Sequence, residues 1–427
     1  MDELKIAIAG LGTVGGGTVK LLHQQADLLA ARTGRPLRLV ACAALEKPAD
    51  LPLETIPFFT DARVMAKDAD YDVLVELIGG SGGIALEVVT TALKRGRHVV
   101  TANKAMVAHH GLLLAELAEQ AGVTFGFEAA VAGGIPVIKA LREGLAANRL
   151  SQVYGILNGT CNYILTTMRE TGREFTDVLA EAQALGYAEA DPSFDIDGVD
   201  TAHKLSILTS LAFGTKLDFA KVHVEGIRHV SAFDIRAAEE LGYRIKLLGI
   251  ARRTESGIEQ RVHPCMVPAR SSIACVEGVF NAVVAEGDFV GRTVFEGRGA
   301  GATPTASAVV ADLLDIAAGR RTPTFGIPAA ALAPLDVSPM EQHRGAFYIR
   351  LTVLDRPGVF ADIAAALRDE DVSMEAILQR GRAPGETVPV VMTVHNTLER
   401  SMTRAVQRIQ AIDAVVETPR LIRIEAF

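Results

Sequence analysis

The chain has 427 residues, which suggests two or three domains at about 150 residues each, and 49% hydrophobic with 22% charged residues is typical of a globular protein. The formal net charge of −8 disfavours general binding to nucleic acid or to anionic membranes. Four cysteines without a Cys-x-x-Cys pair disfavour a zinc ribbon or a disulfide framework and favour a reducing compartment. The opening leaves no room for a signal peptide before the first strand, and no apolar run is of membrane-spanning length, so we expect a cytoplasmic protein.

The first part of the chain alternates short apolar strands with helices. The predicted strands are 5–9, 37–41, 73–78, 98–101 and 123–127, and the predicted helices are 19–29, 86–94 and 111–120. Strands that alternate with helices are connected by helical crossovers, which implies a parallel sheet. The unbroken apolar strands also fit a parallel sheet, because its strands are usually covered on both faces. We therefore predict an α/β protein that begins with a Rossmann-type, doubly wound parallel sheet over residues 1–135.

The middle of the chain has a different pattern. Helical periodicity at 175–185 and 201–213 is followed by a strand-like run at 245–250. We predict an α+β domain over residues 136–299, which we expect to bind the substrate and to dimerise. Residues 300–330 are assigned back to the N-terminal domain.

The end of the chain predicts a small third domain. Proline steps without periodicity mark 331–345 as a linker. Over 346–427 the order strand–helix–strand–strand–helix–strand predicts a ferredoxin-like layout, with turn chemistry at Asp355-Arg356-Pro357-Gly358.

A glycine motif follows the first predicted strand. Gly10-Leu11-Gly12-Thr13-Val14-Gly15 fits Gly-x-Gly-x-x-Gly, in which the first glycine allows a tight turn, the second lets the backbone approach a pyrophosphate, and the third lets helix pack on strand. This placement predicts a dinucleotide site, whereas the alternative is a glycine turn that only closes a strand–helix corner. Residues 41–47, at the end of the second strand, carry neither a well-placed acid nor an arginine, so NAD and NADP both stay open.

Two further segments follow strands of the same predicted sheet. Ligands of open parallel sheets sit beyond the carboxyl ends of the strands. We therefore expect the glycine loop 79–83 to lie against a cofactor, with a flexible turn as the alternative. Lys104, which follows Thr101 and the end of another strand, should point into the same crevice.

Acidic residues are concentrated just before a predicted helix of the middle domain. Five carboxylates lie close together here: Glu189, Asp191, Asp195, Asp197 and Asp200. Such a concentration suits an ammonium group or a metal ion, but the spacing does not match a twelve-residue calcium loop. Asp200 and Lys204 are four apart on one helix face, either as a surface ion pair or as a lysine placed beside acids to handle a proton.

Asn158-Gly159-Thr160-Cys161-Asn162 is a second polar cluster before a helix. Its backbone N–H groups and hydroxyl suit a substrate carboxylate. Cys161 suggests an alternative, an acylating semialdehyde dehydrogenase with a thiolate nucleophile, although no histidine is near it in the sequence. A non-catalytic, amino-acid-sensing regulatory protein is another alternative, which the lysines and acids disfavour.

With these motifs in place, the chain resembles homoserine dehydrogenases over essentially its whole length. The resemblance rests on residues 10–15, 76–80, 101–104, 128–136, 158–165, 186–204 and 299–307. The tail resembles an ACT domain. The resemblance implies interconversion of L-homoserine and L-aspartate 4-semialdehyde with NAD or NADP, on the route to threonine, methionine and isoleucine. Ala43 and Ala44 stand where related chains often carry Arg-Asp.

The resemblance also implies roles for individual residues. Lys204 would be the proton donor and acceptor, with Lys104 and Asp200 as further catalytic residues. Glu189 would take the substrate's ammonium group, and the other implied substrate-binding residues are Asn158, Gly159, Thr160, Asp195 and Asp200. The implied cofactor-binding residues are Gly10, Leu11, Gly12, Thr13, Val14, Gly15, Gly79, Thr101, Lys104 and Gly301. A structural sodium ion would be held, mainly by backbone carbonyls, at Glu128, Val131, Gly133 and Ile135.

For the tail, the resemblance implies allosteric feedback by an amino acid such as threonine, with a dimerisation module without effector as the alternative. We expect a homodimer or homotetramer, and no nucleic-acid or membrane partner.

Overall fold

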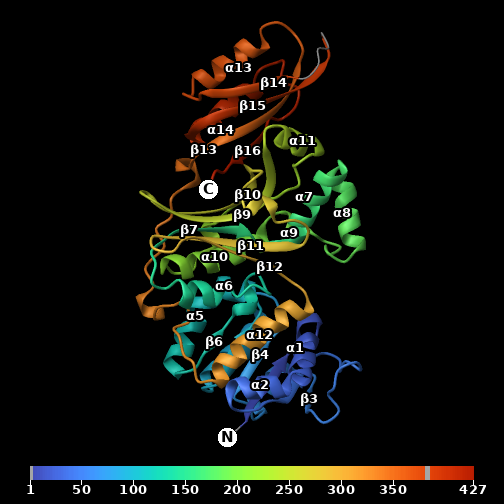
Figure 1. The fold of residues 1–427 in the computed structure, drawn as a ribbon, viewed down its shortest axis with the longest axis vertical. Helices are drawn as coiled ribbons and strands as arrows, with labels where there is room; N and C mark the ends of the chain where they lie inside the picture. The colour runs from blue at the N-terminus through green and yellow to red at the C-terminus, as the bar shows by residue number, and fades with distance from the viewer. Residues whose placement is uncertain (1–2, 380–384) are drawn as a thin grey trace.

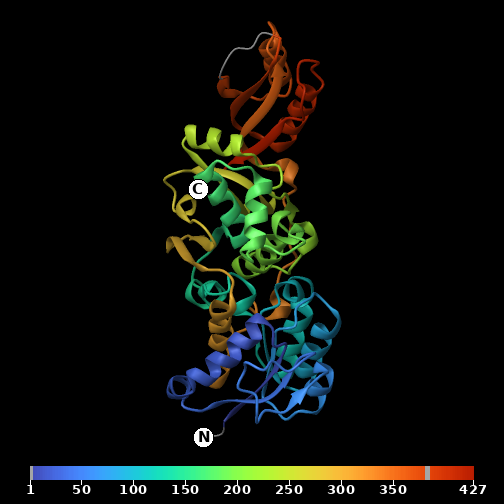
Figure 2. The ribbon, with the colours of Figure 1, turned by 90° about the vertical axis from the view of Figure 1, so that its right-hand side faces the viewer.

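The computed structural model describes residues 3–379 and 385–427. Three parts are stacked along its long axis, which we call the N-terminal, middle and C-terminal domains (Figures 1 and 2). The prediction that no signal peptide precedes the first strand concerns the N-terminus, where residues 1 and 2 lie outside the described range. Among the described residues, no helix is long and apolar enough to cross a membrane.

The N-terminal domain is built on a six-stranded sheet in the order β3-β2-β1-β4-β5-β6, with all neighbouring strands parallel. Its strands are β1 (Leu4–Ala9), β2 (Leu37–Ala43), β3 (Phe58–Phe59), β4 (Val73–Glu76), β5 (His98–Thr101) and β6 (Phe125–Gly126). The five predicted strands are confirmed, although β6 is shorter than expected, and the two-residue β3 was not predicted. The strand order reverses between β1 and β4, the position where such sheets bind ligands.

The helices of this domain are α1 (Thr13–Gln24), α2 (Ala26–Thr33), α3 (Ala62–Asp68), α4 (Gly83–Lys94), α5 (Lys104–Ala121) and α12 (Ala302–Ala317). The predicted helix 19–29 was wrong in its bounds, because α1 starts in the glycine motif and gives way to α2 at Gln25. Glycine disfavours a helix, but here it is needed for close packing. A Cβ on Gly17 would lie 2.8 Å from the Ala302 carbonyl oxygen, so α1 and α12 pack in direct contact.

The middle domain is a mixed sheet with helices on one face (Figure 1). Its strands are β7 (Leu150–Ile156), β8 (His223–Val224), β9 (Tyr243–Thr254), β10 (Gly257–Pro268), β11 (Phe280–Gly287) and β12 (Gly291–Arg298). Its helices are α6 (Val137–Lys139), α7 (Gly159–Thr171), α8 (Phe175–Ala184), α9 (Ser193–Ile196), α10 (Val199–Phe213) and α11 (Ala232–Glu240). The predicted helices 175–185 and 201–213 and the strand at 245–250 are confirmed. Residues 200–210 of α10 are all buried, which fixes the side chains of this helix against the sheet.

The C-terminal domain has the predicted ferredoxin-like order. It comprises β13 (Arg344–Leu354), α13 (Val359–Arg368), β14 (Met374–Gln379), β15 (Thr387–Leu398), α14 (Glu399–Gln410) and β16 (Arg420–Ile424). The sheet order is β16-β13-β15-β14, and β16 also pairs in parallel with β10, with Cys265 opposite Arg423. The middle and C-terminal domains therefore share one continuous ten-stranded sheet, which the sequence did not predict.

Short helical turns complete the described structure. They are a π-helical turn at Ala140–Gly144 and 3₁₀ turns at Glu128–Ala130, Phe219–Lys221, Ile273–Cys275, Ala329–Ala331 and Met340–Gln342. The segment predicted as a linker lies against the middle domain, because Val337 forms a β-bridge with Ile258.

Candidate active site

The glycine motif forms a tight turn between β1 and α1. Gly10 has φ +99°, and a Cβ there would lie 2.4 Å from the Leu77 carbonyl oxygen. A Cβ on Gly15 would lie 2.0 Å from the Gly10 carbonyl oxygen, so both positions require glycine. Gly12 faces open space and precedes the free N–H groups of α1, which leaves room for a phosphate to approach the backbone. The turn therefore fits a dinucleotide.

The predicted cofactor residues divide into two groups. Gly10, Leu11 and Gly12 line a pocket of about 530 Å³ at the end of β2, and Leu11, Gly12 and Thr13 line a second one beside α12. Gly15 is buried beneath the turn and Val14 is half-buried, and neither lines either of these pockets.

Thr101 was predicted to contact the cofactor, but its side chain points into the protein. It is fully buried, and its hydroxyl donates a hydrogen bond to Glu76 (2.6 Å). The other carboxylate oxygen of Glu76 accepts the N–H groups of Ile78 (2.7 Å) and Gly79 (3.1 Å). Asn103 caps α5 and donates to the Gly80 carbonyl (2.7 Å). These buried groups hold the glycine loop that follows β4, a role the sequence did not reveal.

Two pockets meet at Lys104 and Phe194, between the N-terminal and middle domains. One, of about 450 Å³, includes Gly79, Gly80 and His203 in its lining. The other, of about 510 Å³, is lined by Phe194, by Gly301, and by the predicted catalytic lysines Lys104 and Lys204. All six predicted substrate-binding residues line it as well, namely Asn158, Gly159, Thr160, Glu189, Asp195 and Asp200. The fold thus brings residues from three separate parts of the sequence to one place. Tyr187, Asn281 and Arg298 also line this pocket and were not predicted.

Asp200 lies between two lysines at the base of this pocket. Its Oδ2 is 2.7 Å from Nζ of Lys204, one turn further along α10, and its Oδ1 is 2.7 Å from Nζ of Lys104, at the start of α5. Lys204 also donates to the Leu157 carbonyl (2.7 Å). The side chains of Asp200 and Lys204 are buried, whereas 35% of the Lys104 side chain is exposed. The pair predicted at spacing four is therefore not a surface ion pair.

The pKa values of the two lysines that share the Asp200 carboxylate are shifted in opposite directions. Burial lowers the pKa of Lys204 below its ordinary value, although the Asp200 charge opposes the shift. Burial acts in the same direction on Lys104, but there the Asp200 charge outweighs it and the pKa is raised. Two ammonium groups hold the pKa of Asp200 well below its usual range despite burial. One lysine is thereby suited to exchange a proton and the other to remain charged.

Asn158 organises the acids around this centre. Its amide nitrogen donates to Asp195 (2.8 Å) and Asp200 (2.9 Å), and its amide oxygen caps α7 by accepting the N–H of Cys161. The Thr160 hydroxyl donates to the Tyr187 carbonyl (2.7 Å), so the groups left for a carboxylate are the backbone N–H groups at the start of α7.

The remaining nucleophile candidate is unsuited to catalysis. Cys161 is fully buried, and its sulfur donates to the Asp195 carbonyl (3.3 Å). Burial raises the pKa of this thiol well above its usual value, so the reactive thiolate is disfavoured.

The four residues predicted to hold sodium lie in the segment 128–135 after β6, which begins with the 3₁₀ turn Glu128–Ala130. The carbonyl oxygens of Val131 and Gly133 accept no backbone hydrogen bond within the described residues, whereas that of Ile135 accepts the N–H of Val137 (2.7 Å). The Glu128 carboxylate accepts two backbone N–H groups at the start of α6, and burial with the charge of Asp312 raises its pKa to about 7.

A doubly wound parallel sheet with a glycine turn for a dinucleotide, facing a buried lysine, a partly exposed one and an aspartate between them, defines a nicotinamide-dependent dehydrogenase. Comparison with known proteins goes further. Family models described as "Homoserine dehydrogenase, NAD binding domain", "Homoserine dehydrogenase" and "ACT domain" match residues 10–128, 136–314 and 347–414. The chain belongs to the homoserine dehydrogenase family. It is an NAD(P)-dependent oxidoreductase with a C-terminal ACT domain.

Relatives cover the full length of the chain. The homoserine dehydrogenases of Neisseria gonorrhoeae and Pseudomonas aeruginosa are 47% and 46% identical to it, covering 100% of this chain and 100% and 99% of their own. The structure of a homoserine dehydrogenase from Thiobacillus denitrificans matches with a TM-score of 0.93 at 47% identity, covering 100% of this chain and 99% of that one. A hyperthermophilic archaeal homoserine dehydrogenase in complex with NADPH matches with a TM-score of 0.62 at 26% identity, covering 74% and 97%. The predicted family, fold class and enzyme class are confirmed, and the acylating and non-catalytic alternatives are not supported.

Proposed function

We propose that this dehydrogenase interconverts L-homoserine and L-aspartate 4-semialdehyde in the pocket lined by Lys104, Asp200 and Lys204, with Lys204 as proton donor and acceptor. The observation that carries the proposal is the chain of ion pairs that joins these three residues at 2.7 Å across the boundary between two domains. Bound NAD(P) supplies the hydride acceptor or donor. Neutral Lys204 takes the hydroxyl proton during oxidation and returns it during reduction, because burial lowers its pKa.

Lys104 has a different task in this scheme. Its pKa is raised, so it stays cationic and stabilises the negative charge that develops on the substrate oxygen. Asp200 holds both ammonium groups in place.

The amino-acid end of the substrate meets complementary groups in the same pocket. The Glu189 carboxylate lines it and forms no ion pair within the described residues, which suits it to an ammonium group. Asp195, held by Asn158, adds negative charge nearby. The N–H groups of Gly159 and Thr160 at the start of α7 are suited to the carboxylate.

The decisive experiment follows NAD(P)H formation from L-homoserine by absorbance. NAD(P)H formation from homoserine, without phosphate-dependent oxidation of the aldehyde, supports the proposal. If homoserine is turned over with neither NAD nor NADP, the proposal is contradicted.

The pocket at the end of β2 supports a cofactor preference. It is lined by Gly12, Ala44, Glu46 and Arg63, and the guanidinium of Arg63 is already paired with Asp61 (2.9 Å). An acid, and an arginine whose charge is already paired with Asp61, favour the free ribose hydroxyls of NAD over the 2′-phosphate of NADP. A higher kcat/KM with NADP than with NAD would contradict this preference.

A sodium ion in the turn at 128–135 remains part of the proposal. The unclaimed carbonyl oxygens of Val131 and Gly133 support it, because hard cations prefer oxygen ligands. Ala132, between them, has φ +52°, which is unusual for a residue with a side chain. Activity and thermal stability compared in sodium and in tetramethylammonium chloride test the site.

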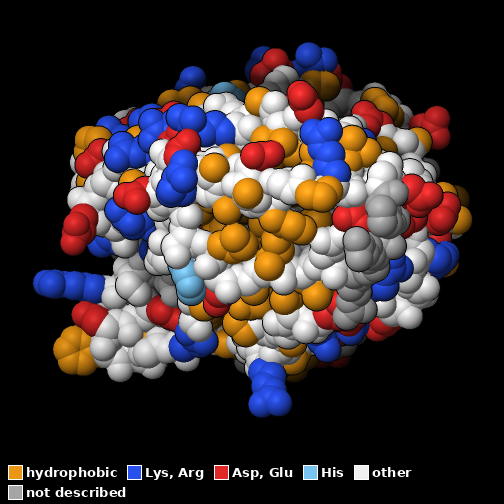
Figure 3. All heavy atoms as spheres, turned by 90° about the horizontal axis from the view of Figure 1, so that it is seen from above, with side chains coloured by type: hydrophobic (Ala, Val, Ile, Leu, Met, Phe, Trp, Pro, Cys, Tyr) orange, Lys and Arg blue, Asp and Glu red, His pale blue; other side chains and the backbone are white. Residues whose placement is uncertain are grey.

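The ACT domain and the oligomeric state complete the proposal. Figure 3, which looks down on the ACT end, shows hydrophobic side chains gathered near the centre of that face. Exposed apolar residues of this domain include Phe360, Ile377 and Val416, and Phe289 of the middle domain is 90% exposed. These surfaces support a homodimer or homotetramer with an amino-acid effector such as threonine between paired ACT domains. Light scattering and a threonine titration of activity test the two parts.

The contacts also support the domain division expected from the sequence. Val309 and Leu313 of α12 share a buried cluster with Ile6 and Ile8, which supports joining residues 300–330 to 1–135. Limited proteolysis, with cuts expected in 331–345 between the middle (136–299) and ACT (346–427) domains, tests it.

A further inference from the structure

The ACT domain meets the middle domain along one edge of β10. β8 pairs with this edge at Val262, and β16 of the ACT domain pairs with it at Cys265 and Met266. The end of β8 therefore lies next to β16. We call this edge the β10 joint: residues 261–266 of β10 with β8, β16 and the polar side chains that contact them.

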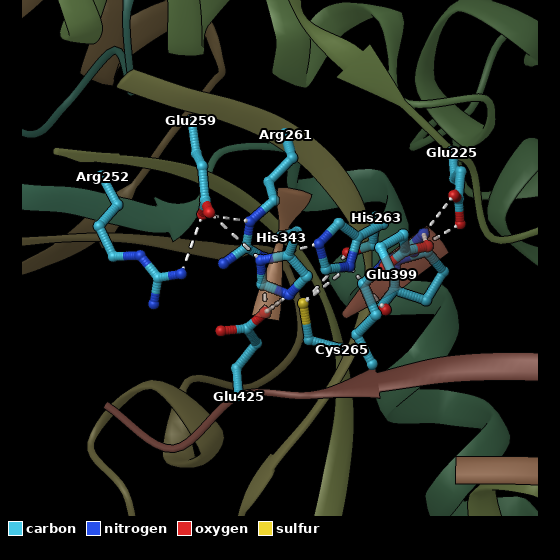
Figure 4. Close-up of polar contacts among 11 residues, drawn as sticks. Glu225, Arg252, Glu259, Arg261, His263, Cys265, His343, Glu399 and Glu425 are labelled. Carbon is cyan, nitrogen blue, oxygen red and sulfur yellow. Dashed lines mark hydrogen bonds and ion pairs between the residues drawn. The ribbon is translucent and has the colours of Figure 1, made fainter. Parts of the chain in front are cut away.

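A buried arginine connects the two strands at the β10 joint. Arg423 of β16 donates to both carboxylate oxygens of Glu225 (2.9 Å each), the residue that follows β8. It also donates to Glu399, at the start of α14 (3.0 Å). Only 5% of the Arg423 side chain is exposed. Burial would raise the pKa of Glu225, but hydrogen bonds from His223 and Arg423 lower it to about 2, so the pair stays charged. Figure 4 shows Glu225 and Glu399 in this network.

The residues after Glu225 contact α9, the helix that carries Asp195 of the substrate pocket. A Cβ on Gly226 would lie 2.2 Å from the carbonyl oxygen of Ile196, the last residue of α9, so the two backbones are in direct contact. Ile227 donates its N–H to the same oxygen (2.8 Å). A shift of Glu225 is therefore passed to α9 through backbone rather than through flexible side chains.

Arg228 fixes the other side of α9. Its guanidinium donates to both oxygens of Asp197 and to the Ser193 hydroxyl (2.8 Å). α9 carries Phe194 and Asp195, which both line the substrate pocket. The segment 225–228 thus contacts the ACT domain at one end and, at the other, α9, which carries Asp195, and Asp197.

A metal site is a competing interpretation of the β10 joint. His263, Cys265 and Glu425 each offer a ligand atom, all within 4.8 Å of one another. Arg261, however, donates to Nε2 of His263 (2.8 Å) and to Glu425, so the lone pair on that nitrogen is occupied. Its Nδ1 is left to donate to the Pro264 carbonyl (3.1 Å). Burial also raises the pKa of the Cys265 thiol well above its usual value. These groups are thus hydrogen-bonding partners at the joint (Figure 4).

We propose that Glu225 and Arg228 are positioning residues that link the ACT domain to the substrate pocket, by setting the place of α9 and hence of Asp195. The inference rests on the proposed function of that pocket. An effector at the ACT domain changes substrate affinity through this link only if its affinity differs between two states of the protein that place Arg423 differently.

The test is Glu225→Gln, because this side chain is 40% exposed and the variant retains its shape. We expect the KM for homoserine to rise about three- to tenfold, with the cofactor KM within twofold of wild type and kcat nearly unchanged. Hydrogen exchange, which needs no substrate, should be faster at 193–197 and unchanged in β9.

Glu370→Gln is the matched control. Glu370 binds Arg404 (2.9 Å) and Arg408 (2.7 Å) inside the ACT domain and does not touch the joint. Its variant should leave the homoserine KM and the exchange of 193–197 at wild-type values. Equal effects in the two variants, or no effect of Glu225→Gln on either measurement, would overturn the link. A wild-type enzyme without homoserine turnover would refute the proposed function, while the exchange comparison would still decide the link.

Discussion

Replacing Lys204 by methionine tests the proton transfer most directly. Methionine retains the length of the side chain but cannot carry a proton. Asp200 keeps two partners, Lys104 at 2.7 Å and Asn158 at 2.9 Å, so no buried charge is left alone and we expect the variant to fold. The sheet that would hold the cofactor is separate from this position, so cofactor affinity should stay near wild type.

The size of the effect follows from the role of the lysine. A positioned general acid or base contributes about 10²- to 10⁴-fold, equivalent to about 3 to 5 kcal/mol of barrier. We expect kcat of Lys204→Met to fall by that factor, measured as NAD(P)H formation at saturating homoserine, while cofactor binding measured by fluorescence changes little. A kcat within tenfold of wild type would refute the assignment.

The pH dependence provides a second check on the same lysine. Oxidation needs neutral Lys204, so the wild-type rate should increase as pH rises through its pKa, which burial places below the ordinary 10.5. Reduction needs the ammonium form, so its rate should fall over the same range. Both slopes should disappear in Lys204→Met, and their persistence would assign the titration to another group.

Three further substitutions test the binding groups. Glu189→Gln should raise the KM for homoserine about 10- to 100-fold, because a hydrogen bond to a charged group contributes about 1.5–3 kcal/mol, and an unchanged KM would remove Glu189 from the site. Gly12→Ala should fold normally, since a Cβ there meets no atom within 4 Å, yet weaken cofactor binding in a titration; unaltered affinity would contradict a phosphate at this turn. Ala44→Arg should raise the ratio of kcat/KM for NADP to that for NAD by adding a cation beside the ribose pocket, and a constant ratio would place the ribose elsewhere.

Local patterns were sufficient to predict much of this molecule. The apolar strands, the glycine turn and the spacing of Asp200 and Lys204 are properties of short segments, and each is found as expected. The burial of the Thr101 side chain was not predicted, because strand side chains alternate between faces and the sequence does not show which face this one takes. The start of α1 was missed because its glycines disfavour a helix unless a neighbouring backbone requires them.

Contacts between distant segments could not be predicted. The pairing of Lys104 with Asp200 joins two domains, and no local pattern encodes it. The opposite pKa shifts of Lys104 and Lys204 depend on burial, which is known only once the fold is known. The pairing of β10 with β16 is likewise invisible in either strand alone.

The sheet shared by the middle and ACT domains makes the regulatory module difficult to detach. Truncation before β13 would expose backbone N–H and C=O groups of β10 at Cys265 and Met266, an open edge that invites aggregation. It would also remove Glu425 from Arg261, whose side chain is 1% exposed, and leave this buried guanidinium with Glu259 at 3.2 Å as its remaining ion-pair partner. A truncated enzyme would therefore need another segment to pair with this edge of β10. Aggregation of such a variant would report on the exposed edge and not on whether catalysis depends on the ACT domain.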